Sequence, residues 1–309
     1  MESLIAQTAE RIFADHVDKA LLDRAEAPAA GAFPDALWRT VQDSGLHLVG
    51  RPDSGSELGD LFGLLKVAGR HALPMPLAEV LVANAVLPDV PDGAGFTTIA
   101  VDGVAPWARA ANRVLDLDGA LHVSFTVEPG ANIAGEPRDS VHAGQTVAVA
   151  VPSELPLYMA LSRTSLMSGA LERTMEMSVS YAMERAQFGR PIAKFQAIQH
   201  NLALLAGEVA AAVRACDGAI EALGTNGADN QIAAAKARVG EAAGVVAEIA
   251  HQVHGAFGFT HEHSLHHYTR RLLAWRDEYG REHEWQERLG RRAAARGADQ
   301  LWDFITRGQ

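Results

Sequence analysis

Residues 181–200 read YAMERAQFGRPIAKFQAIQH and combine the end of a helix, a tight turn and the start of a second helix. Gly189 marks the turn. Beside it stand a cation, an amide and an aromatic ring, which are Arg185, Gln187 and Phe188. A guanidinium suits a pyrophosphate, an amide can pair with polar edges, and a phenyl ring offers a flat face to a purine. The stretch therefore predicts a dinucleotide site at a bend between two helices.

The composition is that of a globular protein with a large core. The chain has 309 residues, of which 48% are hydrophobic and 21% are charged, and this length suggests two or three domains. Its formal net charge of -11 disfavours nucleic acid and anionic membranes as partners. No run approaches the ~18 apolar residues of a membrane helix, and residues 1–20 lack the apolar core of a signal peptide. The single cysteine, Cys216, allows no internal disulfide, so we expect a cytoplasmic setting.

Helical periodicity before and after a short β-rich region predicts the fold class. We expect a mainly α protein with a small β domain (α+β), in which short loops join the long C-terminal helices. The three predicted parts are an N-terminal helical domain over residues 1–86, a reduced β domain over 87–153 and a C-terminal antiparallel four-helix bundle over 154–309.

Within these parts, alternating apolar residues predict strands and 3.6-residue periodicity predicts helices. The predicted strands cover 97–101, 113–117, 121–127 and 146–151. The predicted bundle helices cover 155–186, 194–223, 229–256 and 263–308, the last broken near Gly280.

A second motif lies at residues 252–271, QVHGAFGFTHEHSLHHYTRR. The first motif, the second motif and the order of the three parts together resemble the acyl-CoA dehydrogenase family, and the likeness covers nearly the whole chain. The resemblance implies an acyl-CoA substrate, FAD as cofactor and an electron-transfer protein as a further partner. One departure lies inside the second motif, where the family has two glycines and this chain has Gly255 and Ala256.

The resemblance also assigns the cofactor contacts, and because the second motif reaches the FAD of a neighbouring subunit, it implies an oligomer. Arg185 and Gln187 would meet the pyrophosphate, Phe188 the adenine side, and Phe195 and Gln196 the same end. The residues that would reach the partner's FAD are Gln252, Gly255 and Ala256.

The family's catalytic carboxylate has no counterpart at its usual places. One such place falls on Tyr279, before Gly280, and the other on Met159. An unperturbed tyrosine has a pKa of about 10 and is a poor base at neutral pH. Glu278 and Glu282 flank Tyr279 in a dense charge run, and we interpret both as solvated loop charges. A self-sufficient homo-oligomer that uses Glu278 or Glu282 as the base is a further alternative.

The β region departs from the family as well. No Thr-Glu-Pro-Gly-like loop precedes Thr97, and the similar letters at residues 128–131 follow three predicted strands, so we interpret them as a turn. Because it lacks both the catalytic carboxylate and this loop, the chain resembles the base-less subunit of a heteromeric bacterial acyl-CoA dehydrogenase. Such enzymes pair unlike subunits, here as a heterotetramer, and act on bulky substrates such as steroid side chains. The alternative from another class is a flavin-free, non-catalytic scaffold or regulatory partner of such an enzyme.

Six of the 13 histidines lie between residues 251 and 267. Histidines three or four apart on a helix can bind zinc, but no cysteine lies nearby. We therefore expect polar packing there and no metal.

Overall fold

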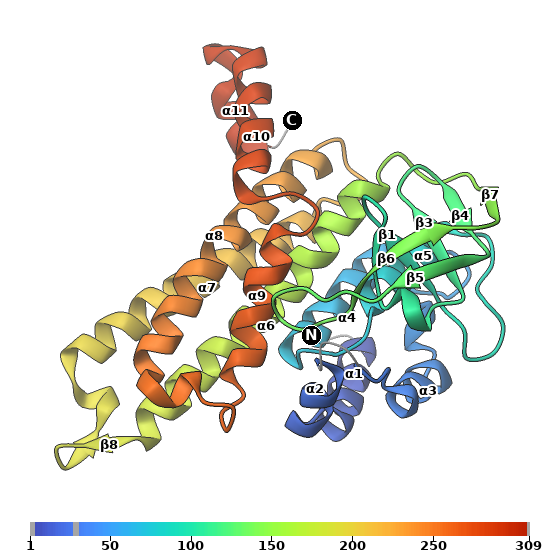
Figure 1. Ribbon diagram of the computed structural model, residues 1–309. Coiled ribbons are helices and arrows are strands. Elements are labelled where there is room, and N and C mark those ends of the chain that lie inside the picture. The colour runs from blue at the N-terminus through green and yellow to red at the C-terminus, as the bar shows by residue number, and fades with distance from the viewer. Residues whose placement is uncertain (1–3, 27–30, 308–309) are drawn as a thin grey trace. The chain divides into compact units, whose positions relative to one another are not determined.

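The computed structural model describes residues 4–26 and 31–307, and its helices precede and follow a β region (Figure 1). This arrangement confirms the predicted mainly α fold with a small β part. The chain forms two compact units, residues 1–162 and 163–309, and the boundary falls inside a long helix. The predicted division into three domains stays a prediction.

The first unit begins with helices whose ends follow local sequence signals. Asp35 sits in the first turn of the third helix, and the left-handed Gly45, with φ of 75°, follows its end. These elements are α1 (Leu4–His16), α2 (Lys19–Ala25), α3 (Asp35–Asp43), η1 (Leu46–Leu48), α4 (Leu58–Arg70) and α5 (Leu77–Val86).

Two small sheets follow. One has the strand order β1-β3-β4-β7, with β1 parallel to β3 and the other pairs antiparallel, and the second has the antiparallel order β2-β6-β5. Their elements are β1 (Thr97–Ala100), β2 (Val104–Pro106), η2 (Ala108–Ala110), β3 (Arg113–Asp116), β4 (Ala120–His122), β5 (Phe125–Glu128), β6 (Arg138–Ala143) and β7 (Thr146–Ala148).

The predicted single strand over 121–127 is wrong, because the chain changes sheets inside it. Val123 and Ser124 both donate their backbone N–H to the Gln145 carbonyl, and this contact separates β4 from β5. Strands β2 and β6 lack a strong apolar run and were not predicted. β6 still pairs with both β2 and β5, so it forms the centre of the second sheet.

The second unit is helical apart from one short hairpin. The predicted break near Gly280 is confirmed, since a turn there separates α9 from α10. The bounds are α6 (Leu155–Glu184), β8 (Ala186–Gln187), β9 (Arg190–Pro191), η3 (Ile192–Lys194), α7 (Gln196–Glu221), α8 (Ala228–His254), η4 (Gly255–Phe259), α9 (Leu265–Asp277), α10 (Glu282–Arg296), η5 (Ala298–Gln300) and α11 (Leu301–Arg307).

Alanine-rich faces pack α7 along α8. The buried residues of α7 recur every three or four positions, as a one-sided helix requires. Small side chains in such a seam leave little room for larger ones, because protein interiors are close-packed. Within residues 4–26 and 31–307, no helix combines the length and apolarity needed to cross a bilayer.

Ala212 and Ala211 on α7 test this packing, since the first is fully buried and the second is exposed. Ala212→Leu should lower the free energy of unfolding by about 1–3 kcal/mol, because an added isobutyl group overpacks the seam. Ala211→Leu should change it by less than about 0.5 kcal/mol. Urea unfolding of both variants measures the difference, and equal effects would contradict the assigned faces of α7.

Candidate functional site

A two-residue hairpin carries the first motif. Its strands β8 and β9 pair Gln187 with Arg190, and Phe188 and Gly189 form the turn between them. Both turn residues have positive φ, 51° and 78°, as a type I′ turn requires. A phenylalanine at positive φ is strained, and such strain clusters at functional sites. The Phe188 side chain is 91% exposed and projects from the tip.

Phe195 and Gln196 lie beside this hairpin, where α7 begins. The Arg190 guanidinium sits 4.3 Å from the centre of the Phe195 ring, and the Phe188 ring meets Phe195 edge-on at 6.1 Å. Gln196 is exposed as the first residue of α7. These three predicted site residues therefore gather at the hairpin tip.

The second motif follows the end of α8. Gly255 has φ of 58° and ψ of −146°, a conformation that L side chains adopt only with strain. Three residues on, Gly258 packs so closely on α8 that an added Cβ would lie 2.8 Å from the His254 Cβ. Glycine at both places lets the backbone fold tightly over the helix end.

The structure brings much of the two motifs together. A hollow of about 450 Å³ is lined by Arg185 and Gln187 from the first motif and by Gln252, Gly255 and Ala256 from the second. All five belong to one chain, although Gln187 and Gln252 are 65 positions apart in the sequence. Phe188, Phe195 and Gln196 do not line this hollow.

A second hollow, of about 510 Å³, adjoins the first through shared residues. Tyr181, Arg185 and Phe257 line both hollows, so Arg185 stands between them. We call the two hollows together the nucleotide groove, after the dinucleotide that the first motif predicts. The second hollow is lined in addition by Arg173, Glu176, Met177, Ser180, Glu184 and His263.

Aromatic rings form the wall that the hollows share, and the sequence reasoning did not assign them a role. Tyr181 stacks on His254 with ring centres 4.5 Å apart, and lies nearly parallel to Phe257 at 5.9 Å with 14° between the planes. His263 meets Phe257 edge-on at 5.0 Å. The sequence does contain one signal for Tyr181, because it lies four residues before Arg185 and therefore shares a helix face with that predicted site residue.

The groove holds little positive charge besides Arg185. Burial lowers the pKa of His254 to about 4 and also lowers the pKa of His263, so both rings are neutral at pH 7. Arg173 is ion-paired with Glu176 at 3.3 Å. Arg185 is exposed and makes no ion pair among the described residues. Its guanidinium is therefore available to an anionic group of a ligand.

The histidines of residues 251–267 pack through hydrogen bonds and ring contacts. His251 Nε2 lies 2.9 Å from Thr269 Oγ1, which joins α8 to α9. His254 Nδ1 lies 2.7 Å from the Ala250 carbonyl oxygen, and His266 Nδ1 lies 2.8 Å from that of His263. Because the Ala250 carbonyl accepts a hydrogen bond from Nδ1–H, the buried Nε2 of neutral His254 carries a lone pair, and this nitrogen has no hydrogen-bond partner among the described residues.

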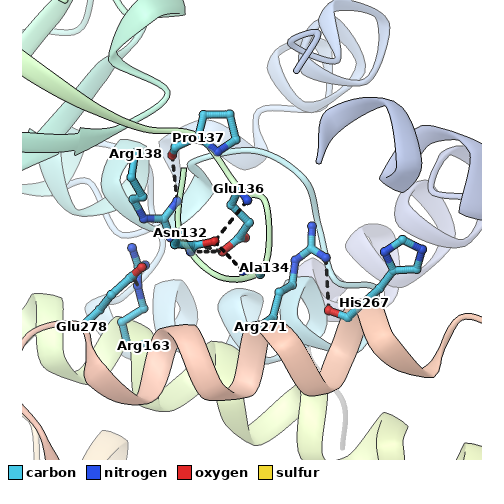
Figure 2. A network of polar contacts seen from close by, with 9 residues as sticks. All are labelled: Asn132, Ala134, Glu136, Pro137, Arg138, Arg163, His267, Arg271 and Glu278. Carbon is cyan, nitrogen blue, oxygen red and sulfur yellow. Dashed lines mark hydrogen bonds and ion pairs between the residues drawn. The ribbon is translucent and has the colours of Figure 1, made fainter. Parts of the chain in front are cut away.

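The turn between α9 and α10 carries Tyr279, the first predicted base position. Tyr279 and Gly280 both have positive φ, 57° and 97°. The guanidinium of buried Arg163 lies 5.0 Å from the centre of the Tyr279 ring. Arg163 Nε also donates to Glu278 Oε2 at 2.5 Å, and Figure 2 shows these two side chains together.

The interpretation of Glu278 as a solvated loop charge is therefore wrong. Its carboxylate is the counter-ion of Arg163, whose side chain is only 2% exposed, and a buried cation needs such a partner. Glu282 is half-buried, with Oε2 3.9 Å from Arg276 Nε. At the second base position, Met159 is fully buried in α6 and offers no carboxylate.

Buried Lys236 holds the same turn from α8. Its Nζ donates to the carbonyl oxygens of Arg276 and Gly280, each at 2.8 Å. Burial lowers the pKa of Lys236 to about 8, although the charges of Glu278 and Glu282 oppose the shift. Trp285 Nε1 adds a hydrogen bond to the Tyr279 carbonyl at 3.2 Å. The turn is thus fixed by its own helix ends and by α8.

A family model and curated relatives both point to acyl-CoA dehydrogenases. The family model described as acyl-CoA dehydrogenase, C-terminal domain, matches residues 158–282. The chain is 28% identical over 295 residues to the acyl-CoA dehydrogenase IpdE2 of Mycobacterium tuberculosis, which covers 87% of this chain and 89% of that protein.

Solved structures show the same fold. A chain of the ChsE4–ChsE5 complex from Mycobacterium tuberculosis matches with a TM-score of 0.84 and 21% identity, over 96% of this chain and 99% of that chain. A chain of a variant of the Tcur3481–Tcur3483 steroid ACAD matches with a TM-score of 0.82 and 25% identity, over 94% of this chain and 97% of that chain.

The lowered pKa of Lys236 predicts how the free energy of unfolding depends on pH. Between pH 8 and the unfolded value of about 10.4, the unfolded chain binds a proton that the folded chain has lost, so the free energy of unfolding rises with pH. Lys236→Met removes this term. The wild type should therefore gain about 3 kcal/mol over the variant across this window, and lose that gain again as the pH falls through 8. Urea unfolding at a series of pH values measures it.

The control is exposed Lys194, whose replacement by methionine should leave the difference from wild type independent of pH. A flat difference for Lys236→Met as well would contradict the burial of a titrating amine at this place.

Glu278→Gln separates a counter-ion from a catalytic base. Because it leaves the buried Arg163 guanidinium without its anion, it should lower the free energy of unfolding by about 3 kcal/mol. Glu282→Gln, with its longer and more exposed contact, should cost less than about 1 kcal/mol. Denaturant unfolding compares them. A stable Glu278→Gln variant that had lost acyl-CoA turnover would instead support the self-sufficient homo-oligomer.

Proposed function

Because the chain belongs to the acyl-CoA dehydrogenase family of oxidoreductases, we propose that it is an FAD-binding subunit of an assembly that dehydrogenates an acyl-CoA thioester between Cα and Cβ. The observation that carries the proposal is the nucleotide groove, where residues of both sequence motifs surround an unpaired arginine. The carboxylate base would come from a homologous partner subunit.

The residues present fit a dinucleotide. Arg185 would bind the pyrophosphate, which is the strongest use of an exposed and unpaired guanidinium. Gln187 and Gln252 line the same hollow and can donate or accept hydrogen bonds. The parallel rings of Tyr181 and Phe257 offer an apolar surface to a planar base. Ala256 adds a methyl group where the family has glycine, at an exposed position that leaves the hollow open.

FAD, when bound, would supply the acceptor for the hydrogen that leaves Cβ. The share of this chain is to bind and orient the cofactor, because positioning alone can lower a barrier by several kcal/mol. Removal of the α-proton needs a base near its operating pH. Tyr279 and Met159 occupy the two expected places, and Glu278 is committed to Arg163, so this chain carries no base there.

The assembly would be a heterotetramer of this chain and a homologous subunit. The absent base supports unlike subunits, and the neighbours include the ChsE4–ChsE5 complex. A homo-oligomer remains the alternative arrangement. An acyl-CoA with a bulky polycyclic acyl group is the proposed substrate, supported by the steroid ACAD among the similar structures, and an electron-transfer protein is the proposed electron acceptor.

The second candidate function is a flavin-free scaffold for a catalytic homologue. It is favoured by the same lack of a carboxylate at Tyr279 and by the short β region, whose strands have at most six residues. In this case the groove would bind no nucleotide and the chain would only stabilise its partner.

The visible spectrum of the chain, purified alone and with its homologous subunit, distinguishes the two. Flavin absorbance that depends on this chain supports the proposal, and we expect acyl-CoA turnover only in the assembly. Arg185→Gln should weaken FAD binding by about tenfold or more, since it removes a charge-assisted contact of about 1.5–3 kcal/mol.

Arg214→Gln is the matched control, because Arg214 is an exposed arginine paired with Glu221 away from the groove. It should retain wild-type FAD content. A colourless assembly that is still active would exclude the flavin role, and turnover by the chain alone would exclude the need for a partner's base.

A further inference from the structure

We propose that the nucleotide groove selects an adenosine diphosphate whose ribose carries no extra phosphate, and that Glu184 excludes the phosphorylated ribose of coenzyme A. The inference rests on the flavin function proposed above and adds which of two related nucleotides the groove accepts. FAD and coenzyme A both contain adenosine diphosphate, and the ribose of coenzyme A bears a further 3′-phosphate. A protein that meets both must distinguish them at this end.

The groove can neutralise one anionic group well, and the residue that does so is Arg185. Arg173 already binds Glu176 at 3.3 Å. His254 and His263 are neutral at pH 7, because burial lowers the pKa of each ring. The buried Nε2 of His254 presents a lone pair, which repels an anion. A pyrophosphate at Arg185 therefore uses the available positive charge of the residues that line the groove.

The second hollow is unfavourable for a further phosphate. Glu184 lines it, is exposed, and makes no ion pair among the described residues. α6 ends at Glu184 and α8 ends at His254, so two helix C-termini, with their partial negative charge, meet at the groove. A carboxylate is by contrast a good acceptor for ribose hydroxyl groups, as in dinucleotide-binding folds.

The rings fix where the purine lies. Tyr181 and Phe257 line both hollows and differ by only 14° in orientation, so they form one surface beside Arg185. The stack of Tyr181 on buried His254 holds this surface in place. A purine on these rings, with its diphosphate at Arg185, would have its ribose in the second hollow, which Glu184 lines together with Tyr181 and Arg185.

The size of the discrimination follows from simple electrostatics. The repulsion between two unit charges about 4 Å apart in water is enough to weaken the affinity for a ligand roughly fivefold. A phosphate monoester carries more than one charge at pH 7. We therefore expect the chain to bind ADP at least fivefold more tightly than 3′-phospho-ADP.

Isothermal titration calorimetry of the 309-residue chain with these two nucleotides tests the inference, and the same titration is repeated on the flavin-depleted assembly. Glu184→Gln keeps the shape and removes the charge, so the preference should fall at least threefold with ADP affinity retained. Glu184→Lys should reverse it in favour of 3′-phospho-ADP. Glu287→Gln, an exposed glutamate of α10 that does not line the groove, should leave the wild-type ratio unchanged.

Equal affinities in the wild type, or an unchanged ratio in Glu184→Gln, would overturn the selectivity while leaving the flavin role intact. If neither nucleotide binds to the chain or to the assembly, the proposed flavin function fails and this inference fails with it.

Discussion

The stack of Tyr181 on His254 joins the end of α6 to the end of α8, and the candidate site depends on it. Each helix end carries one of the two motifs, and both hollows are lined by residues from each end. Once the two ends meet, Arg185 and Gln187 face Gln252 and the glycine turn across one groove. Aromatic stacking and ring burial supply the stabilisation, while the polar groups are left available for a ligand.

The stack also sets the charge of the groove. Burial against Tyr181 and neighbouring rings removes water from His254, so its neutral form is favoured. Histidines that would be partly cationic on the surface thus contribute no charge here. The groove then has a single unpaired arginine between the negative ends of two helices, which is a setting for one anionic linkage and not for several.

At the other end of the bundle, two buried cations organise the turn that holds Tyr279. Arg163 requires Glu278 as its counter-ion, and Lys236 requires the carbonyl oxygens of Arg276 and Gly280. A carboxylate at Glu278 is therefore present for the stability of the turn. Proximity of an acidic residue to an expected catalytic position is weak evidence of a base when a buried cation lies within hydrogen-bonding distance.

Local periodicity and turn chemistry were sufficient for the helices and for the turn at Gly189, because a helix face and a Gly-containing turn depend on residues a few positions apart. The two short strands that flank this turn were not predicted. Sequence alone predicted the bundle, the positions of the two motifs and the lack of a carboxylate at Tyr279 and Met159. Which side chains these residues contact depends on the folded chain. Glu278 finds Arg163 across 115 residues, the run 121–127 divides between two sheets, and Phe188 points outward while Tyr181 and Phe257 form the wall. Such outcomes depend on contacts between distant segments, whose burial and pairing energies no local pattern contains.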